Sequence, residues 1–223
     1  ADEREWQQGA KEAEVALPET FLELALHASL EKMIEKQGFT KPTPIQGQAI
    51  PLINSGVDVV GLAQTGTGKT AAFVLPIVSK LLSDAETVVK PGSPRALIVT
   101  PTRELAEQVL TCVRSFSPKQ GFKSMAVYGG LRIFTQIRDL RNPIDILVAC
   151  PGRLIDLMDQ GAINLSDVKT VVLDEADQML DMGFIGPIKH ILSCVSKERQ
   201  TLLFSATMAK AIEQLAREVM NSP

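Results

Sequence analysis

The chain has 223 residues, of which 45% are hydrophobic and 22% are charged, and its formal net charge is −3. A chain of this length and composition can bury a sizeable core without disulfides or structural metals. The slightly acidic balance argues against a uniformly basic surface, so any nucleic-acid contact must depend on a local patch. The cysteines at 112, 150 and 194 are far apart and form no C-x-x-C pair, which argues against a zinc site or a disulfide framework and favours a reducing, intracellular compartment (cytoplasm or nucleus).

The first part of the chain is polar. Residues 1–17 hold no apolar run typical of a secretory signal peptide, so we expect an extended or frayed N-terminal arm. No run approaches the roughly 18 apolar residues that cross a bilayer, so no membrane partner is expected. Residues 18–220 are expected to form one domain. It begins with a helical stretch at Phe21–Lys36 and a turn-rich stretch at Gly38–Gln46.

Short runs rich in apolar residues then recur along the chain. Most are nearly continuous rather than alternating, a pattern typical of strands that are buried on both faces of a parallel sheet. The expected strands are Asp58–Ala63, Ala96–Thr100, Ser124–Tyr128, Ile144–Ala149, Thr170–Leu173 and Thr201–Ser205.

Helix-like stretches separate these strands. They are Lys69–Leu82, Arg103–Phe116, Arg132–Arg141, Arg153–Gln160, Ile185–Val195 and Ala209–Met220. Strands that alternate with helices of this length indicate βαβ units. The sequence therefore predicts a single α/β domain with a mostly parallel sheet, helices on both faces, and ligands at the carboxyl ends of the strands.

A glycine-rich loop follows the first expected strand and opens a helix. Its glycines allow the backbone to approach phosphate closely, with N–H groups and the helix N-terminus directed at the oxygens. Lys69 supplies positive charge for the β- and γ-phosphates, and the Thr70 hydroxyl can ligate magnesium. The strict pattern has glycine where this chain has Ala63, and a small residue still fits there. The expected nucleotide-binding residues of the loop are Ala63, Gln64, Thr65, Gly66, Thr67, Gly68, Lys69 and Thr70.

Acidic residues follow the strand at Thr170–Leu173. Asp174 is placed to hold magnesium, through water, and Glu175 can orient or deprotonate the attacking water. Asp177 is expected to make a polar contact within the protein. Lys69, Asp174 and Glu175 are therefore the expected catalytic residues for hydrolysis of ATP. The expected cofactors are ATP and Mg²⁺.

The tetrapeptide D-E-A-D at residues 174–177 is the signature of the DEAD-box RNA helicases. The chain resembles the N-terminal RecA-like (P-loop NTPase) domain of that family over about residues 21–220. Residues 38–46 resemble the Q motif, which implies that Gln46 reads the adenine edge and that Phe21 supports the base. An amide can donate and accept at once, which matches adenine N6 and N7.

Three further segments resemble RNA-binding motifs of the family. They imply contacts with RNA phosphates through backbone N–H groups, a threonine hydroxyl and two arginines. Motif Ib usually begins with threonine where this chain has Cys150. Because a thiol is the poorer hydrogen-bond donor, one phosphate contact is expected to be lost. The residues concerned are Pro101, Thr102 and Arg103 (motif Ia), Gly129 and Gly130 (motif GG), and Pro151, Gly152 and Arg153 (motif Ib).

The segment Ser205–Thr207 resembles motif III, which implies that Ser205 and Thr207, with Asp177, couple the nucleotide site to RNA and to a second domain. That second RecA-like domain, which carries arginine fingers, has no counterpart in this sequence. We therefore expect a monomeric domain that binds nucleotide but hydrolyses ATP poorly alone.

Three functions stay open on the sequence. The first is an ATP-dependent RNA helicase that separates short duplexes locally, and the second is an ATP-gated RNA clamp or scaffold. The third is an unrelated P-loop ATPase that acts on DNA. The proline-flanked Gln46 and the D-E-A-D tetrapeptide argue against this third function.

Overall fold

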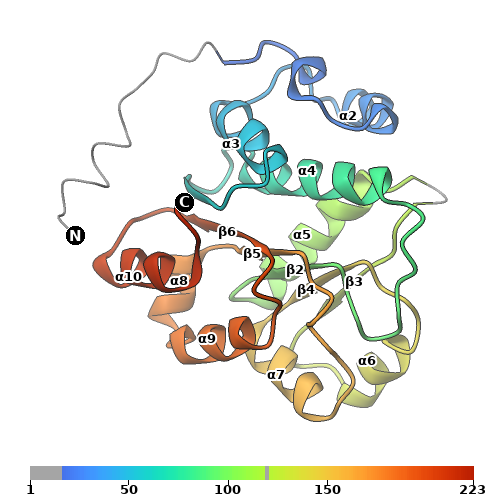
Figure 1. Cartoon of the computed structure of the whole chain (residues 1–223), viewed down its shortest axis with the longest axis vertical. Coiled ribbons are helices and arrows are strands. Elements are labelled where there is room, and N and C mark those ends of the chain that lie inside the picture. The colour runs from blue at the N-terminus through green and yellow to red at the C-terminus, as the bar shows by residue number, and fades with distance from the viewer. Residues whose placement is uncertain (1–16, 119–120) are drawn as a thin grey trace.

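The computed structural model describes residues 17–118 and 121–223 (Figure 1). Six strands form one sheet in the order β1-β6-β5-β2-β4-β3, and every pair of neighbouring strands is parallel. The strands are β1 (Val59–Leu62), β2 (Ala96–Val99), β3 (Ser124–Val127), β4 (Ile146–Ala149), β5 (Thr170–Leu173) and β6 (Gln200–Ser205). The predicted α/β fold is therefore confirmed, with a sheet that is entirely rather than mostly parallel.

Helices cover both faces of this sheet (Figure 1). On one face lie η1 (Phe21–Leu24), η2 (Ala28–Leu30), α2 (Glu31–Lys36), α3 (Pro44–Asn54), α4 (Lys69–Ser83) and α5 (Arg103–Ser115). On the other lie α6 (Ile133–Asp139), α7 (Pro151–Asp159), α8 (Ala176–Asp181), α9 (Ile185–Ser193) and α10 (Lys210–Val219). Each strand therefore contributes to two cores.

The strand β2 shows how this burial arises. Ile98 faces the core beneath α4 and α5, whereas Leu97 and Val99 face the core beneath α6–α10. All four residues of β2 are buried. Because both faces of the pleat are covered, a continuous apolar run is required, and this is why the strands lack the alternation of a half-exposed sheet.

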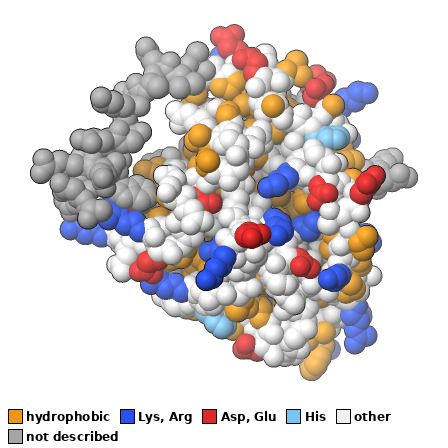
Figure 2. All heavy atoms as spheres, in the orientation of Figure 1, with side chains coloured by type: hydrophobic (Ala, Val, Ile, Leu, Met, Phe, Trp, Pro, Cys, Tyr) orange, Lys and Arg blue, Asp and Glu red, His pale blue; other side chains and the backbone are white. Residues whose placement is uncertain are grey.

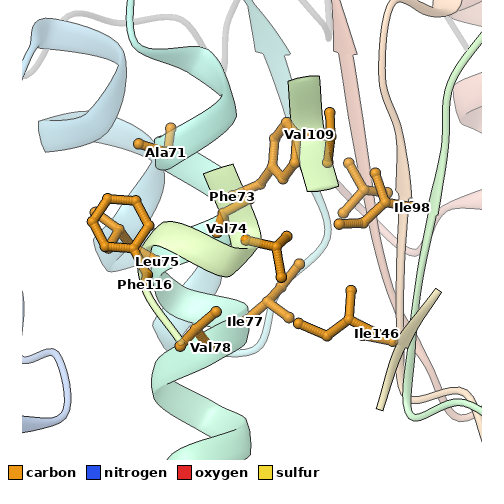
Figure 3. Packing of buried hydrophobic residues seen from close by; sticks show 14 of the residues in the cluster. Ala71, Phe73, Val74, Leu75, Ile77, Val78, Ile98, Val109, Phe116 and Ile146 are labelled. Atoms are coloured by element: carbon orange, nitrogen blue, oxygen red, sulfur yellow. The ribbon is translucent and has the colours of Figure 1, made fainter. Parts of the chain in front are cut away.

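The helix α4 is the most deeply buried helix beside the sheet. Figure 3 shows Phe73 and Ile77 of α4 directed towards the strand residues Ile98 and Ile146, with Val109 of α5 alongside. Burial of each such side chain contributes about 1.5–3 kcal/mol. This packing fixes α4, and with it the loop that precedes α4, on the sheet.

The N-terminal helical stretch differs from the single helix expected at Phe21–Lys36. Ala25 has a left-handed backbone (φ 51°), and the chain forms two short 3-10 turns before α2. The His27 N–H donates to the Ser79 Oγ of α4 at 2.8 Å. A tertiary contact has therefore replaced a helical hydrogen bond at this position.

Two helices were absent from the sequence-based assignment. The helix α3 begins at Pro44, inside the stretch expected to be turn-rich, and the other missed helix is α8. The Thr43 N–H donates to the Gln46 Oε1 at 2.9 Å, which satisfies a donor at the start of α3. Threonine, proline at the first helical position and glutamine three residues after the cap form a capping signal that the sequence already carried.

Charged side chains of both signs are interspersed over the face shown in Figure 2, with apolar side chains scattered among them. This distribution agrees with the small net charge of −3. None of the helices in the described ranges is long and apolar enough to cross a membrane. The predicted polar arm at residues 1–17 lies, apart from Leu17, outside the described residues.

Candidate nucleotide and nucleic-acid site

The glycine-rich loop lies between the end of β1 and the start of α4. Gly66 and Gly68 both have positive φ angles, 84° and 85°, in the left-handed region that glycine adopts without strain. The Thr67 Oγ1 donates to the Gln64 carbonyl at 2.7 Å and closes the turn. Residues 64–67 are exposed, so the loop is open to a ligand above the N-terminus of α4.

Gly68 is also needed because other atoms lie close to it. A Cβ at this position would lie 2.6 Å from the Gln46 Nε2 and 2.9 Å from the Thr43 Oγ1. The Gln46 Nε2 donates to the Gly68 carbonyl at 3.1 Å. The start of α3 and the phosphate loop are therefore in direct contact.

We predict that Gly68→Ala destabilises the domain by about 2 kcal/mol, because it combines backbone strain with a steric clash. Gly66→Ala is the matched control. It has the same positive φ but no atom within 4 Å of its Cβ, so a loss of only about 1 kcal/mol is expected. Urea unfolding of the two variants measures the difference. Equal losses would show that the Gln46 contact does not restrict this position.

Lys69 is the first residue of α4, and its side chain meets the carboxyl end of β5. Its Nζ lies 3.0 Å from the Asp174 Oδ1 and forms a second ion pair with Glu175. Lys69 is 4% exposed and Asp174 is 2% exposed. The structure thus brings together the three residues that the sequence singled out as catalytic.

Burial and charge act against each other in this triad. Burial raises the pKa of the Asp174 carboxyl, and Lys69 only partly offsets that rise. For Lys69 burial acts to lower the pKa, but Asp174 and Glu175 together outweigh it and raise the pKa. Lys69 therefore stays charged at neutral pH and compensates the carboxylates beside it.

Glu175 has an unusual backbone for a residue other than glycine. Its φ and ψ are 54° and 50°, in the left-handed region, at the N-cap of α8. The Glu175 N–H donates to the Asp174 Oδ1 at 3.0 Å. Such a conformation costs of order 1–3 kcal/mol and clusters at functional sites. Here it turns the chain sharply after β5 so that both carboxylates reach Lys69.

A cleft of about 260 Å³ opens between the loop and α5. Its polar side holds Thr70 and Asp174, whose oxygens are of the kind that Mg²⁺ prefers. Its lining is Phe39, Thr65, Gly66, Gly68, Lys69, Thr70, Ala71, Leu105, Gln108, Val109, Cys112, Asp174 and Glu175. An exposed glycine loop, a buried lysine and these oxygens fit a magnesium-bound phosphate.

The two residues expected to hold adenine lie beside this cleft but do not line it. Gln46 is 0% exposed, and both ends of its amide are bonded to backbone, at Thr43 and Gly68. Phe21 is buried and packs edge-on against Phe39, with ring centroids 6.1 Å apart. Each polar atom of the Gln46 amide keeps one further bonding position. Adenine reaches that position only if a covering residue moves.

Of the residues expected to bind RNA, Thr102 is the N-cap of α5 and Arg103 is its first residue. The Thr102 Oγ1 accepts the Leu105 N–H at 3.3 Å and caps that helix. Arg103 is exposed, and its guanidinium lies 5.1 Å from the centre of the Tyr128 ring. The Tyr128 hydroxyl in turn donates to Glu107. The Thr102 hydroxyl is therefore already engaged, whereas Arg103 is presented at the surface.

The other expected RNA residues follow the carboxyl ends of β2, β3 and β4. Gly129, Gly130 and Gly152 are exposed, whereas Pro101 and Pro151 are buried. Arg153 is largely turned inward: its side chain is 12% exposed and its Nη1 donates to the carbonyls of Tyr128 and Leu131, both at 3.0 Å. Arg153 thus fixes the Gly129–Gly130 loop in addition to any contact with a ligand.

Cys150, the departure from the usual motif, is the N-cap of α7 and makes no side-chain capping bond. Burial raises the pKa of its thiol. The thiol is therefore protonated at neutral pH and is a weak donor. The loss of one phosphate contact at Cys150 stays a prediction.

The three residues expected to couple the sites do meet. The Asp177 N–H donates to the Ser205 Oγ, and the Thr207 Oγ1 donates to the Asp177 Oδ2, both at 3.3 Å. The Ala63 N–H also donates to the Ser205 carbonyl at 3.0 Å. The end of β6 therefore contacts both the acidic turn and the start of the phosphate loop.

One contributor was missed by sequence reasoning. Gln136 of α6 is buried, and its Nε2 donates to the Tyr128 carbonyl at 3.1 Å. It helps Arg153 to hold the loop at Gly129–Gly130. No sequence signal marks it, since a glutamine in a polar helix is usually exposed.

The fold and the triad together define a RecA-like domain of the P-loop class. A model of the DEAD/DEAH box helicase family matches residues 43–215, and the chain belongs to that family. The resemblance stated from the sequence motifs is therefore confirmed.

Relatives of known family support this assignment. The DEAD-box ATP-dependent RNA helicase CshA of Streptococcus pneumoniae is 48% identical over 91% of this chain and 38% of that protein. DEAD-box ATP-dependent RNA helicase 24 of Arabidopsis thaliana is 43% identical over 92% and 27%. The crystal structure of a DEAD box protein from Methanococcus jannaschii is 39% identical with a TM-score of 0.83, over 92% of this chain and 55% of that one. The chain thus spans 27% to 55% of these relatives.

Proposed function

We propose that this chain is the ATP-binding domain of an ATP-dependent RNA helicase. The observation that carries the proposal is the buried contact of Lys69 with Asp174 and Glu175 beneath an open glycine loop. The triad places one cation and two carboxylates where a triphosphate and its metal are handled in P-loop enzymes. The two curated relatives named above are both called ATP-dependent RNA helicases, which supports RNA as the substrate class.

In this proposal the loop residues Ala63–Thr70 bind the phosphates through N–H groups and the Lys69 charge. Thr70 and, through water, Asp174 would hold Mg²⁺, which would supply compensation of the phosphate charge. When a nucleotide enters, Lys69 exchanges its carboxylate partners for phosphate oxygens. Glu175 is then released to orient or deprotonate the attacking water.

RNA is proposed to bind along the carboxyl ends of β2, β3 and β4. Arg103 and the exposed backbone at Gly129, Gly130 and Gly152 would contact phosphates. Contacts of this kind fix position without reading sequence. Asp177, Ser205 and Thr207, which are already bonded to one another, would transmit the state of the nucleotide site to that surface.

The curated relatives are much longer than this chain. We propose that a second RecA-like domain completes the enzyme and supplies arginine fingers, which are worth roughly 10³–10⁵ in rate in related phosphoryl transfer. Residues 18–220 alone would then bind ATP and one side of the RNA backbone as a monomer, with weak turnover and no unwinding.

Nucleotide selectivity tests the proposal. The native chain should bind Mg·ATP more tightly than Mg·GTP, and Gln46→Ala should weaken ATP about tenfold through lost hydrogen bonds while changing GTP less. Isothermal titration with both nucleotides measures the ratio. Gln48→Ala is the matched control, because Gln48 is an exposed amide two residues further along α3.

Two other outcomes are informative. Equal loss for both nucleotides would show that Gln46 acts only through its contact with Gly68 and does not read the base. If the native chain binds GTP as tightly as ATP, adenine recognition is removed from the proposal altogether.

A further inference from the structure

Phe134 is an exposed aromatic side chain beside the loop at Gly129–Gly130. It lies in the first turn of α6 and is 78% exposed, and Leu131 nearby is 45% exposed. In the described part of the chain, no other phenylalanine or tyrosine is exposed. A single exposed apolar residue is ordinary, so its surroundings must decide whether it has a role.

The backbone around Phe134 is held from two sides. Arg153 donates to the carbonyls of Tyr128 and Leu131, and the buried Gln136 donates to the Tyr128 carbonyl from within α6. Phe134 is therefore presented on a fixed segment and not on a mobile loop. A platform fixed in this way loses little conformational entropy when a planar ligand stacks on it.

The same segment is locally basic. Between Gly129 and Arg141 the chain holds three cations, Arg132, Arg138 and Arg141, and one carboxylate, Asp139, which gives a local charge of 3 − 1 = +2. The three arginines are exposed, and Arg138 is paired with Asp139. On a chain of net charge −3, this segment has the sign that complements a phosphate backbone.

We propose that Phe134 stacks on an unpaired nucleobase of a strand whose phosphates follow the loop at Gly129–Gly130. This inference rests on the proposed RNA-binding function. Binding of single strands combines a cationic path for the backbone with aromatic faces for the bases. Phe134 follows Gly130 by four residues on the segment that Arg153 and Gln136 hold, and the flanking arginines favour a nucleic acid over an apolar protein surface. The stacked base gives this domain a base-dependent contribution to affinity that phosphate contacts alone do not supply.

The test compares two strands on the native chain and on Phe134→Ala. One is a fluorescently labelled single-stranded RNA, and the other is an abasic ribose-phosphate strand of equal length, both titrated at low ionic strength. Phe134→Ala should weaken the RNA about tenfold, which is typical of one lost stack, and leave the abasic strand unchanged. Phe134→Trp should retain the native affinity for RNA. Leu22→Ala, an exposed apolar truncation in η1 on the other face of the sheet, should change neither.

The outcomes separate this inference from the proposed function. If the native chain binds both strands and Phe134→Ala weakens neither, the proposed RNA binding is retained but the stacking role of Phe134 is wrong. The exposed surface at Phe134 would then be assigned to a protein partner. If Phe134→Ala weakens both strands equally, Phe134 supports the loop and does not stack, which also overturns the inference. If the native chain binds neither strand, the proposed RNA-binding surface itself fails. If Phe134→Ala unfolds at the same midpoint temperature as the native chain, misfolding is excluded as the cause of a loss of affinity.

Discussion

Replacing Lys69 with alanine is expected to abolish detectable binding of Mg·ATP and to destabilise the ligand-free domain by about 3–5 kcal/mol. The loss of binding follows because, among the described residues that line the cleft, Lys69 is the only lysine or arginine. The loss of stability follows because Asp174 is 2% exposed and would lose the partner that offsets the cost of its burial. Isothermal titration and urea unfolding measure the two effects separately.

The pH dependence of this variant follows from the sign of the Asp174 shift. Burial already raises the pKa of Asp174, and loss of Lys69 removes the opposing influence, so the folded pKa rises further. A raised folded pKa means that stability is fully present below the unfolded value near 4 and falls as pH rises through the folded value. Lys69→Ala should therefore regain stability when acidified from neutral pH towards pH 4.

Two further variants isolate the causes. Lys69→Ala combined with Asp174→Asn should recover much of the stability, because the uncompensated charge is gone, but should still not bind nucleotide. Lys80→Ala is the matched control, an exposed lysine on the same helix, and should leave both properties unchanged. If Lys69→Ala binds Mg·ATP within about threefold of the native chain, a factor worth under 1 kcal/mol, the phosphate role of Lys69 is wrong.

The sheet and the meeting of Lys69 with Asp174 and Glu175 were predictable because their signals are local. An apolar run such as Thr170–Leu173 specifies a buried strand, and the carboxyl ends of parallel strands share one edge. Lys69, Asp174 and Glu175 follow two such strands, so topology brings together residues that lie 106 positions apart. The glycines at 66 and 68 likewise indicate a left-handed backbone conformation, which only glycine adopts easily.

What the sequence did not predict depends on tertiary contacts. The break in the helix at Ala25 is accompanied by a hydrogen bond from the His27 N–H to Ser79, which lies 52 positions further along the chain. The inward direction of Arg153 depends on two carbonyls of a loop that follows a different strand. Residue type and spacing place such side chains at an edge of the sheet, but the direction in which each one points is decided by its neighbours.

Gln46 shows in one residue what the sequence predicts and what it does not. Its position in the motif marks it as part of the nucleotide site, and the structure places it in contact with the phosphate loop. Its complete burial was not foreseen, because an amide that reads a ligand is expected to face the cleft. The sequence thus predicts which residues make up the site, but not how deeply each of their side chains is buried.

A glycine in β1 has a large expected effect on stability. Gly61 is paired with Phe204 of β6, and a Cβ on Gly61 would lie 2.4 Å from the Phe204 Cε1 and 2.5 Å from its Cδ1. The ring is fully buried and packs against Phe73 with centroids 5.3 Å apart, so it has no free space to enter. Gly61→Ala should therefore cost about 3 kcal/mol of unfolding free energy, near the upper end for overpacking of a core.

This strain would reach the nucleotide site. Gly61 lies two residues before Ala63, whose N–H donates to the Ser205 carbonyl at the end of β6. If β1 is pushed away from β6, that bond lengthens and the phosphate loop moves relative to Asp174. A weaker affinity for Mg·ATP is expected in whatever fraction of Gly61→Ala still folds.

A double-mutant cycle tests the proposed cause. Phe204→Leu alone should destabilise the core, but in the Gly61→Ala background the smaller side chain makes room for the new Cβ. The two changes together should then cost clearly less than their sum, with a coupling of about 1 kcal/mol or more between the sites. Gly186→Ala in α9 is the control, since its Cβ meets nothing within 4 Å and alanine favours a helix, so its stability should be equal or higher. Additive losses at residues 61 and 204 would show that the two strands separate freely, and that close contact between β1 and β6 is not what holds the phosphate loop in place.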